Sequence, residues 1–146
     1  MLQRMKKMKT FELLHPVMEE EKLGGITNLG LAHMGDAVYE VLVRTWLCMH
    51  GRVTSRGLHK ETVAYVAAPA QARAMEKIMP LLSEQELAVY KRGRNTRVKS
   101  VPQHAEIAQY HAATGLECLF GWLWLRGETA RIEELFASIM EEDDAS

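Results

Sequence analysis

The sequence predicts an all-α protein that forms a single domain of six or seven helices. Apolar residues recur at the three- and four-residue spacing of an amphipathic helix along most of the chain. No stretch alternates between apolar and polar residues as a strand would. A length of 146 residues fits one domain, and neither an internal repeat nor a long linker divides the chain.

The clearest predicted helix runs from about Asn28 to His50, and Gly51 ends it. Its apolar residues lie at helical spacing: Leu31, Met34, Val38, Val41, Leu42 and Trp46. Residues 55–79 predict two shorter helices, because Pro69 lacks a backbone N–H and disfavours helical geometry in the residue before it. Pro80 ends the second of these helices.

A capping box marks the start of the next predicted helix. The Ser83 hydroxyl and the Glu86 carboxylate can each accept a hydrogen bond from a backbone N–H that the helix leaves free. This helix is predicted to run to about Lys91, and residues 92–101 are predicted to form a basic loop.

Pro102 suits the first turn of the helix that follows, and Gly127 suits its C-terminal cap. A last helix covers about residues 128–140. We expect residues 1–25 to form a peripheral N-terminal extension and residues 26–146 to form the domain that carries the function.

Composition and charge exclude several classes of protein. A net charge of −1 argues against a uniformly basic nucleic-acid-binding protein, so nucleic acid would have to bind at a local patch. No apolar run reaches the length of a membrane span, and no apolar segment of a secretory signal follows the lysine-rich N-terminus. Cys48 and Cys118 lie among apolar residues and are expected to be buried free thiols. We therefore expect a cytoplasmic protein with no membrane partner.

One acid lies in an unfavourable place in the first long helix. Asp36 follows Gly35 among apolar neighbours, although Asp is a poor residue inside a helix and an unpaired carboxylate is costly to bury. Gly35 would let another segment approach the backbone closely. On its own, Asp36 is better explained by a capping interaction or a salt bridge than by a functional role.

A second isolated acid, Glu117, lies in the nearly uncharged segment 113–125. If the two helices pack together, Glu117 and Asp36 could meet in the core, where two carboxylates repel unless a proton or a cation lies between them. Mg²⁺ prefers such oxygen ligands and keeps several waters. From the spacing alone, a metal site and a structural role are equally favoured. Glu40, one turn beyond Asp36, could support such a site or form a salt bridge with Arg44.

Several segments together resemble one family. LAHMGDAVYEVLVRTWL (31–47) resembles the signature helix of ribonuclease III, and ATGLECLFGWLWL (113–125) resembles the second catalytic helix of that family. LHKETVAYVAAPAQARAM (58–75) and the segment that begins RGRNTRVK (92–127) resemble, in the same order, its short bacterial branch, Mini-ribonuclease III. The resemblance covers about residues 28–140. It implies a ribonuclease III-type catalytic domain, and we expect no separate double-stranded-RNA-binding domain.

The resemblance also implies which residues carry the chemistry. Asp36 and Glu117 match the family's metal-binding carboxylates and would be the catalytic residues, holding Mg²⁺ with Mn²⁺ as an alternative. The wider family has two further acids, at positions that Ala32 and Thr114 occupy here. Fewer protein oxygens and more waters would therefore surround the metal.

Residues 91–99 carry five positive charges. Such a cluster is most often a solvated surface loop. Because the chain is otherwise slightly acidic, the cluster also suits the phosphates of double-stranded RNA, with binding that weakens as salt rises. The resemblance implies RNA contacts from Arg92, Arg94, Asn95, Arg97 and Lys99.

His59 and Lys60 precede Tyr65 and Gln71, in a region that the resemblance places against the RNA or in support of the site. Surface packing of His59 and core packing of Tyr65 are the alternatives. In the family, the segment at residues 33–34 helps to form a symmetric homodimer, whose two sites could cut both strands. The implied substrate is precursor large-subunit (23S) ribosomal RNA, with a ribosomal protein as a further partner.

The sequence thus favours a Mg²⁺-dependent endoribonuclease that cleaves double-stranded RNA and leaves 5′-phosphates. The alternative is a non-catalytic helical RNA-binding or ribosome-associated module, which would have no use for two costly carboxylates on apolar helices. A helical protein-interaction domain is a weaker third hypothesis, because it leaves the basic segment without a role.

Overall fold

The computed structural model describes residues 13–51, 55–96 and 106–141. Within these residues it has seven α-helices and no strand, which confirms the predicted all-α class. The helices in chain order, with the 3-10 helix η2, are α2 (Glu20–Leu23), α3 (Asn28–Met49), α4 (Ser55–Val66), α5 (Ala68–Ile78), η2 (Met79–Leu81), α6 (Glu84–Arg94), α7 (Ile107–Leu125) and α8 (Thr129–Met140).

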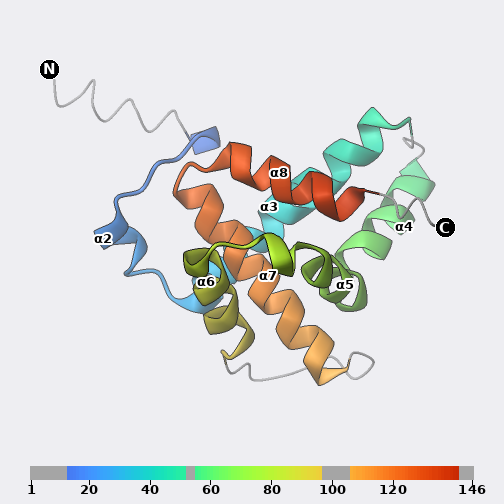
Figure 1. The fold of residues 1–146 in the computed structure, drawn as a ribbon. Helices are drawn as coiled ribbons and strands as arrows, with labels where there is room; N and C mark the ends of the chain where they lie inside the picture. Colours follow the sequence, from blue (N-terminus) through green and yellow to red (C-terminus); the bar gives the residue numbers. More distant parts are fainter. Residues whose placement is uncertain (1–12, 52–54, 97–105, 142–146) are drawn as a thin grey trace, which may run out of the picture.

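The central helix of the fold is α7, and helices α3, α5, α6 and α8 pack around it (Figure 1). Its sequence explains this position, because residues 113–123 are buried on every side except at Glu117. A helix that is apolar all round needs partners on all its faces. Despite this apolar character, no helix among the described residues is long and apolar enough to cross a membrane.

Two glycines bring α3 and α7 into backbone contact. A Cβ atom at Gly35 would lie 1.6 Å from the carbonyl oxygen of Glu117, and one at Gly121 would lie 2.0 Å from the carbonyl oxygen of Leu31. The close approach expected at Gly35 is therefore confirmed. Because Asp36 is the next residue on α3, this crossing places it beside Glu117.

The helix ends follow the predicted signals where the structure describes them. Ser83 and Glu86 form the capping box, with N–H···O distances of 2.8 and 3.1 Å. Gly51 and Gly127 follow α3 and α7 with φ angles of +74° and +83°, a left-handed conformation that favours glycine. Pro102, the predicted start of the helix before Gly127, lies outside the described residues, and α7 begins at Ile107.

The predicted basic loop is wrong at its beginning, because α6 continues through Arg94 and Asn95 is its C-terminal cap. Gly93 is among the predicted loop residues that belong to this helix. In the fold it lies inside the helix against α7, where a Cβ atom would be 2.6 Å from the Cβ of Cys118. This glycine therefore allows two helices to pack closely.

The two cysteines differ from the expectation that both are buried. Cys118 is fully buried on α7, whereas Cys48 is exposed. The reason is that Cys48 lies in the last turn of α3, on a side of the helix that no other described element covers. Both are free thiols.

A buried ion pair joins the start of α6 to α8. Glu86 is 6% exposed, and both its carboxylate oxygens accept hydrogen bonds from Arg131, at 2.8 and 2.9 Å. Arg131 also donates to the carbonyl oxygen of Leu81 at 2.7 Å. The hydrogen bonds from Arg131 lower the pKa of Glu86, although burial opposes them.

Glu86→Gln is expected to lower the free energy of unfolding by about 3 kcal/mol at pH 7, because it removes the buried carboxylate of the pair and leaves Arg131 with the exposed carboxylate of Glu134. In the wild type, this contribution is present above the unfolded-state pKa of Glu86 and is lost as pH falls through the lowered folded-state value. Urea unfolding at pH 7 and pH 3 measures both effects. Glu84→Gln, at an exposed position on the same helix, is the matched control. Equal stabilities of the two variants at pH 7 would contradict the prediction.

Candidate active site

Asp36 and Glu117 meet at the crossing of α3 and α7, close enough for a hydrogen bond between their carboxyl groups. The sequence predicted this meeting in the core, and the structure corrects the location. Asp36 is exposed and Glu117 is half-buried, so the pair lies at the edge of the core. A substrate can therefore reach the pair from the Asp36 side.

The pair holds Glu117 in an unusual protonation state. Burial, together with the neighbouring Asp36 carboxylate, raises the pKa of Glu117 to about 8. Two adjacent carboxylates cannot both be ionised cheaply in a partly buried site. In the absence of a cation, Glu117 therefore holds its proton at neutral pH, and a divalent cation would replace that proton.

The donor set fits a hard cation that keeps most of its waters. Two carboxylates are the kind of ligand that Mg²⁺ takes from a protein. At the positions of the wider family's other acids, Ala32 is buried and Thr114 donates its hydroxyl to the Tyr110 carbonyl at 3.0 Å. No cluster of three or more His, Cys, Asp or Glu that could hold a metal occurs among the described residues. The pair thus suits Mg²⁺ with a largely aqueous shell.

Glu40 does not join the pair. Its carboxylate forms a salt bridge of 2.6 Å with Arg44, one turn along α3. Of the two roles open to Glu40 from the sequence, the structure therefore shows the salt bridge.

Among the described residues, Gln71 is a further polar side chain beside Glu117. Its amide, on α5, approaches Glu117 closely enough to favour the ionised carboxylate. The sequence carried a signal for this position, because Gln71 shares a helical face with Ala74, Met75 and Ile78, all buried. A polar residue on such a face needs a partner.

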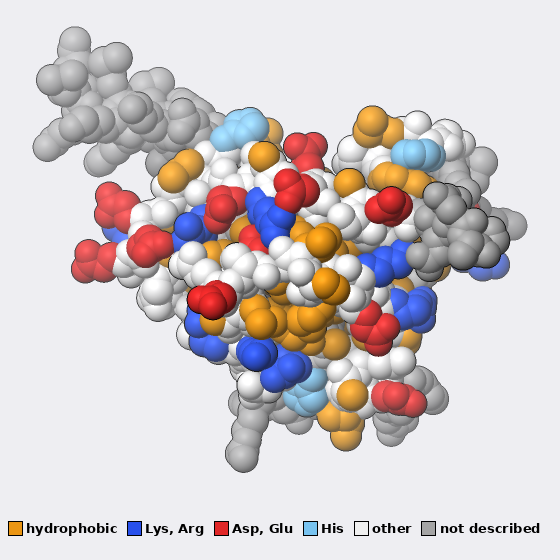
Figure 2. Space-filling view, viewed as in Figure 1, with side chains coloured by type: hydrophobic (Ala, Val, Ile, Leu, Met, Phe, Trp, Pro, Cys, Tyr) orange, Lys and Arg blue, Asp and Glu red, His pale blue; other side chains and the backbone are white. Residues whose placement is uncertain are grey.

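The predicted RNA-binding residues divide into three groups. His59 and Lys60 are exposed on α4. Arg92, Arg94 and Asn95 lie at the end of α6, where Figure 2 shows Lys and Arg side chains gathered on the surface. Arg97 and Lys99 lie outside the described residues. The charges on α6 also have a structural use, since cations near a helix C-terminus interact favourably with its dipole.

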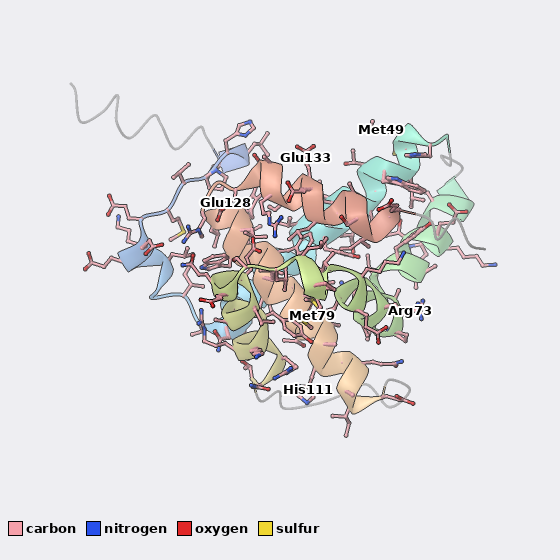
Figure 3. All side chains as sticks on the ribbon, in the orientation of Figure 1. Met49, Arg73, Met79, His111, Glu128 and Glu133 are labelled. Carbon is pink, nitrogen blue, oxygen red and sulfur yellow. The ribbon has the colours of Figure 1, made fainter. Side chains whose placement is uncertain are left out.

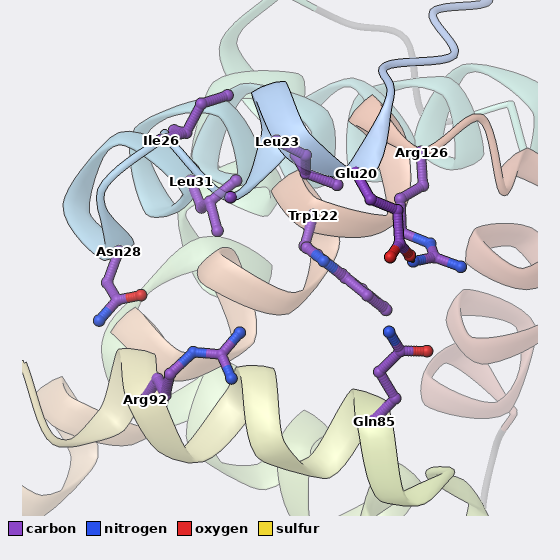
Figure 4. A pocket seen from close by; sticks show the side chains of 10 residues that line it. Glu20, Leu23, Ile26, Asn28, Leu31, Gln85, Arg92, Trp122 and Arg126 are labelled. Atoms are coloured by element: carbon purple, nitrogen blue, oxygen red, sulfur yellow. The ribbon is translucent and has the colours of Figure 1, made fainter.

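Arg92 lines a pocket of about 280 Å³ between α2, α3, α6 and α7 (Figure 4). Trp122 forms one wall, and the guanidinium of Arg126 lies 4.4 Å above its ring. Arg126 is held there by salt bridges to Glu20 at 2.6 Å and Glu128 at 2.7 Å. This pocket shares no residue with the carboxylate pair.

Comparison with known proteins identifies the family of the chain. The family model described as the ribonuclease III domain matches residues 29–128. The Mini-ribonuclease 3 of Thermoanaerobacter sp. (strain X514) is 40% identical over 129 residues, which cover 86% of this chain and 91% of that protein. The Mini-ribonuclease 3 of Symbiobacterium thermophilum is 44% identical over 107 residues, which cover 73% and 82%.

A solved structure shows the same fold. The crystal structure of protein FN1578 from Fusobacterium nucleatum superposes with a TM-score of 0.72 at 28% identity, covering 78% of this chain and 91% of that one. The family model and the relatives confirm the resemblance seen in the segments 31–47 and 113–125. The chain therefore belongs to the ribonuclease III family, and it is an endoribonuclease.

Proposed function

We propose that this endoribonuclease cleaves double-stranded RNA in a Mg²⁺-dependent reaction and matures the ends of precursor 23S ribosomal RNA. The observation that carries the proposal is the Asp36–Glu117 pair, which lies beside solvent at a helix crossing built from two glycines. The catalytic domain would be residues 26–146. The Mini-ribonuclease 3 relatives support the RNA substrate.

In this proposal the two carboxylates have different tasks. Glu117, half-buried and fixed on the central helix, would anchor the ion, while the exposed Asp36 would face the phosphodiester. When bound, Mg²⁺ would activate water and stabilise the charge that develops on the phosphoryl oxygens. Hydrolysis that breaks the bond to the 3′-oxygen leaves a 5′-phosphate and a 3′-hydroxyl.

The basic residues would hold the duplex by its backbone. Arg92 and Arg94 on α6, and Lys60 on α4, carry positive charge at half-buried or exposed positions. Double-stranded RNA is recognised mainly through its phosphates, its shape and its 2′-hydroxyl groups. His59, Asn95, Arg97 and Lys99 complete the proposed set. Binding should weaken steeply as salt rises.

The protein would act as a homodimer through the face formed by α3 and α8. A cavity of about 420 Å³ on this face is lined by Leu14, Met34, Val41 and Trp124. Leu14 is 73% exposed and Val41 is 62% exposed. A second apolar groove continues along the same two helices, past Met49 and Glu133 (Figure 3). Exposed apolar patches of this kind mark interaction surfaces.

Val41→Glu is expected to convert the dimer to a monomer, because it places a charge in the centre of the proposed interface. Light scattering after size-exclusion chromatography measures the mass. Leu81→Glu, at another exposed apolar side chain away from this face, should stay dimeric. A wild-type monomer, or a dimer that survives Val41→Glu, would contradict the proposal.

Cleavage of a long, fully paired RNA by the purified protein tests the function. We expect cutting with Mg²⁺ and none with excess chelator. A precursor 23S rRNA duplex, compared with an unrelated duplex of equal length, tests the natural substrate. Salt-sensitive RNA binding without cutting under any divalent metal would instead identify a non-catalytic RNA-binding module.

A further inference from the structure

Gln71 is a polar side chain in a fully buried place. The residue is 1% exposed, and its side-chain amide nitrogen, Nε2, makes no hydrogen bond among the described residues. Buried polar atoms in native proteins are nearly always hydrogen-bonded, because a donor that has lost water and found no partner destabilises the fold. An unpartnered amide that a fold nevertheless keeps points to a partner in another state of the protein.

The group that this amide faces is the carboxyl of Glu117. The amide lies near enough to favour the ionised form of Glu117, yet its nitrogen has no hydrogen-bond partner among the described residues. The Glu117 carboxyl also interacts with Asp36. The Gln71 donor is therefore in place beside an acceptor with which it makes no hydrogen bond.

A divalent cation held by Asp36 and Glu117 would allow the Gln71 amide to find its hydrogen-bond acceptor. A cation held by the two carboxylates would keep Glu117 ionised, and a carboxylate oxygen could then accept a hydrogen bond from a neighbouring donor. Carboxylates that bind metals are commonly held by such additional hydrogen bonds, which fix the orientation of the ligand and raise its affinity for the metal. Within the described residues, Gln71 is the amide beside Glu117 that can supply this bond.

We propose that Gln71 is a positioning residue for Mg²⁺: its side-chain N–H donates to the Glu117 oxygen that does not face the ion, and so sets the affinity of the Asp36–Glu117 pair for the metal. This inference rests on the proposed metal site and deepens it. Gln71 itself touches neither RNA nor metal in this assignment.

Metal affinity in the absence of RNA tests the proposal. Gln71→Met has nearly the same shape without the donor, and it should weaken Mn²⁺ binding by about 10-fold or more, as loss of such supporting bonds does elsewhere. Electron paramagnetic resonance of free Mn²⁺ measures the affinity. Met75→Leu, one turn further along the buried face of α5, is the matched control and should bind Mn²⁺ like the wild type.

The melting temperature of the metal-free protein separates this role from a structural one. If Gln71 only supported the fold, Gln71→Met would lower that temperature and leave the affinity of the folded protein for Mn²⁺ unchanged, which would overturn the proposal. We expect the reverse: an unchanged or higher melting temperature, because an unpartnered amide has been removed, together with weaker Mn²⁺ binding.

A measurement on the wild type does not depend on the variant folding. In a Mg²⁺ titration followed by NMR, the side-chain N–H signals of Gln71 should move downfield as the new hydrogen bond forms. Mg²⁺ binding that leaves these signals in place would overturn the role of Gln71 alone. If the wild type bound neither Mg²⁺ nor Mn²⁺, the metal site itself would be overturned, and the inference with it.

Discussion

Replacing Glu117 with Gln is expected to abolish RNA cleavage and, at the same time, to stabilise the metal-free protein at pH 8. The proposed function needs two carboxylates for the cation, and their loss should lower the cleavage rate by about 10³-fold or more, corresponding to several kcal/mol of transition-state stabilisation. The same carboxylates repel each other when no cation is bound. An amide at position 117 removes the repulsion and can donate a hydrogen bond to Asp36.

The contribution of Glu117 to the stability of the metal-free protein is expected to become less favourable as pH rises. The pKa of Glu117 is about 8 in the folded protein, against 4.5 for an unperturbed side chain. Between these values the folded state holds a proton that the unfolded state has lost, so this carboxyl makes the metal-free protein less stable as pH rises. After allowance for its partial exposure, Glu117→Gln should gain about 1–2 kcal/mol at pH 8. For a domain near this size, that is a rise of about 2–8 °C in melting temperature.

Thermal unfolding of Glu117→Gln and the wild type in chelator at pH 5 and pH 8 checks the predicted gain in stability. Single-turnover cleavage of paired RNA in Mg²⁺ checks the predicted loss of activity. Asp36→Asn should lose cleavage as Glu117→Gln does. Glu40→Gln is the matched control on α3, since its salt bridge to Arg44 lies outside the pair, and it should keep cleavage within about tenfold. If Asp36→Asn and Glu117→Gln both cut RNA at the rate of this control, the assignment of the two carboxylates is wrong.

Replacing Gly35 with Ala is expected to be among the most destabilising single changes in the protein. Helix propensity alone predicts a gain of up to about 1 kcal/mol from this substitution. In the fold, the new methyl group would lie 1.6 Å from the Glu117 carbonyl oxygen, and that oxygen belongs to the backbone of the central helix. The helices α3 and α7 would have to move apart, at an expected cost of at least about 3 kcal/mol.

Urea unfolding of Gly35→Ala and Ala88→Gly compares the free energy lost by separating the helices with the free energy lost through helix propensity alone. Ala88 is exposed on α6, so its replacement should cost only the propensity term of about 1 kcal/mol. Because Asp36 and Glu117 are held together by the same crossing, folded Gly35→Ala protein should also lose cleavage. A variant as stable as the wild type would show that the two backbones are not in contact.

The helices and the two carboxylates could be predicted from the sequence. Periodicity, the Ser83–Glu86 capping box and the glycines at positions 51 and 127 depend on local interactions, so their effect can be predicted without knowing which helices pack together. Asp36 and Glu117 stood out because an acid among apolar residues of a helix needs a special reason. The Glu40–Arg44 salt bridge could also be proposed from the sequence, because the two residues lie one helical turn apart.

The partners of the glycines inside helices could be learned only from the packing. Gly35 and Gly93 lie at contacts with α7, and local sequence does not say which helix will approach them. The exposure of Cys48 likewise depends on which side of α3 the other helices cover. The proximity of Gln71 to Glu117 also depends on the packing, because the two residues belong to helices that are distant in the chain. Local sequence fixes the conformation of each segment, but contacts across the fold fix burial, proximity and the protonation of the site.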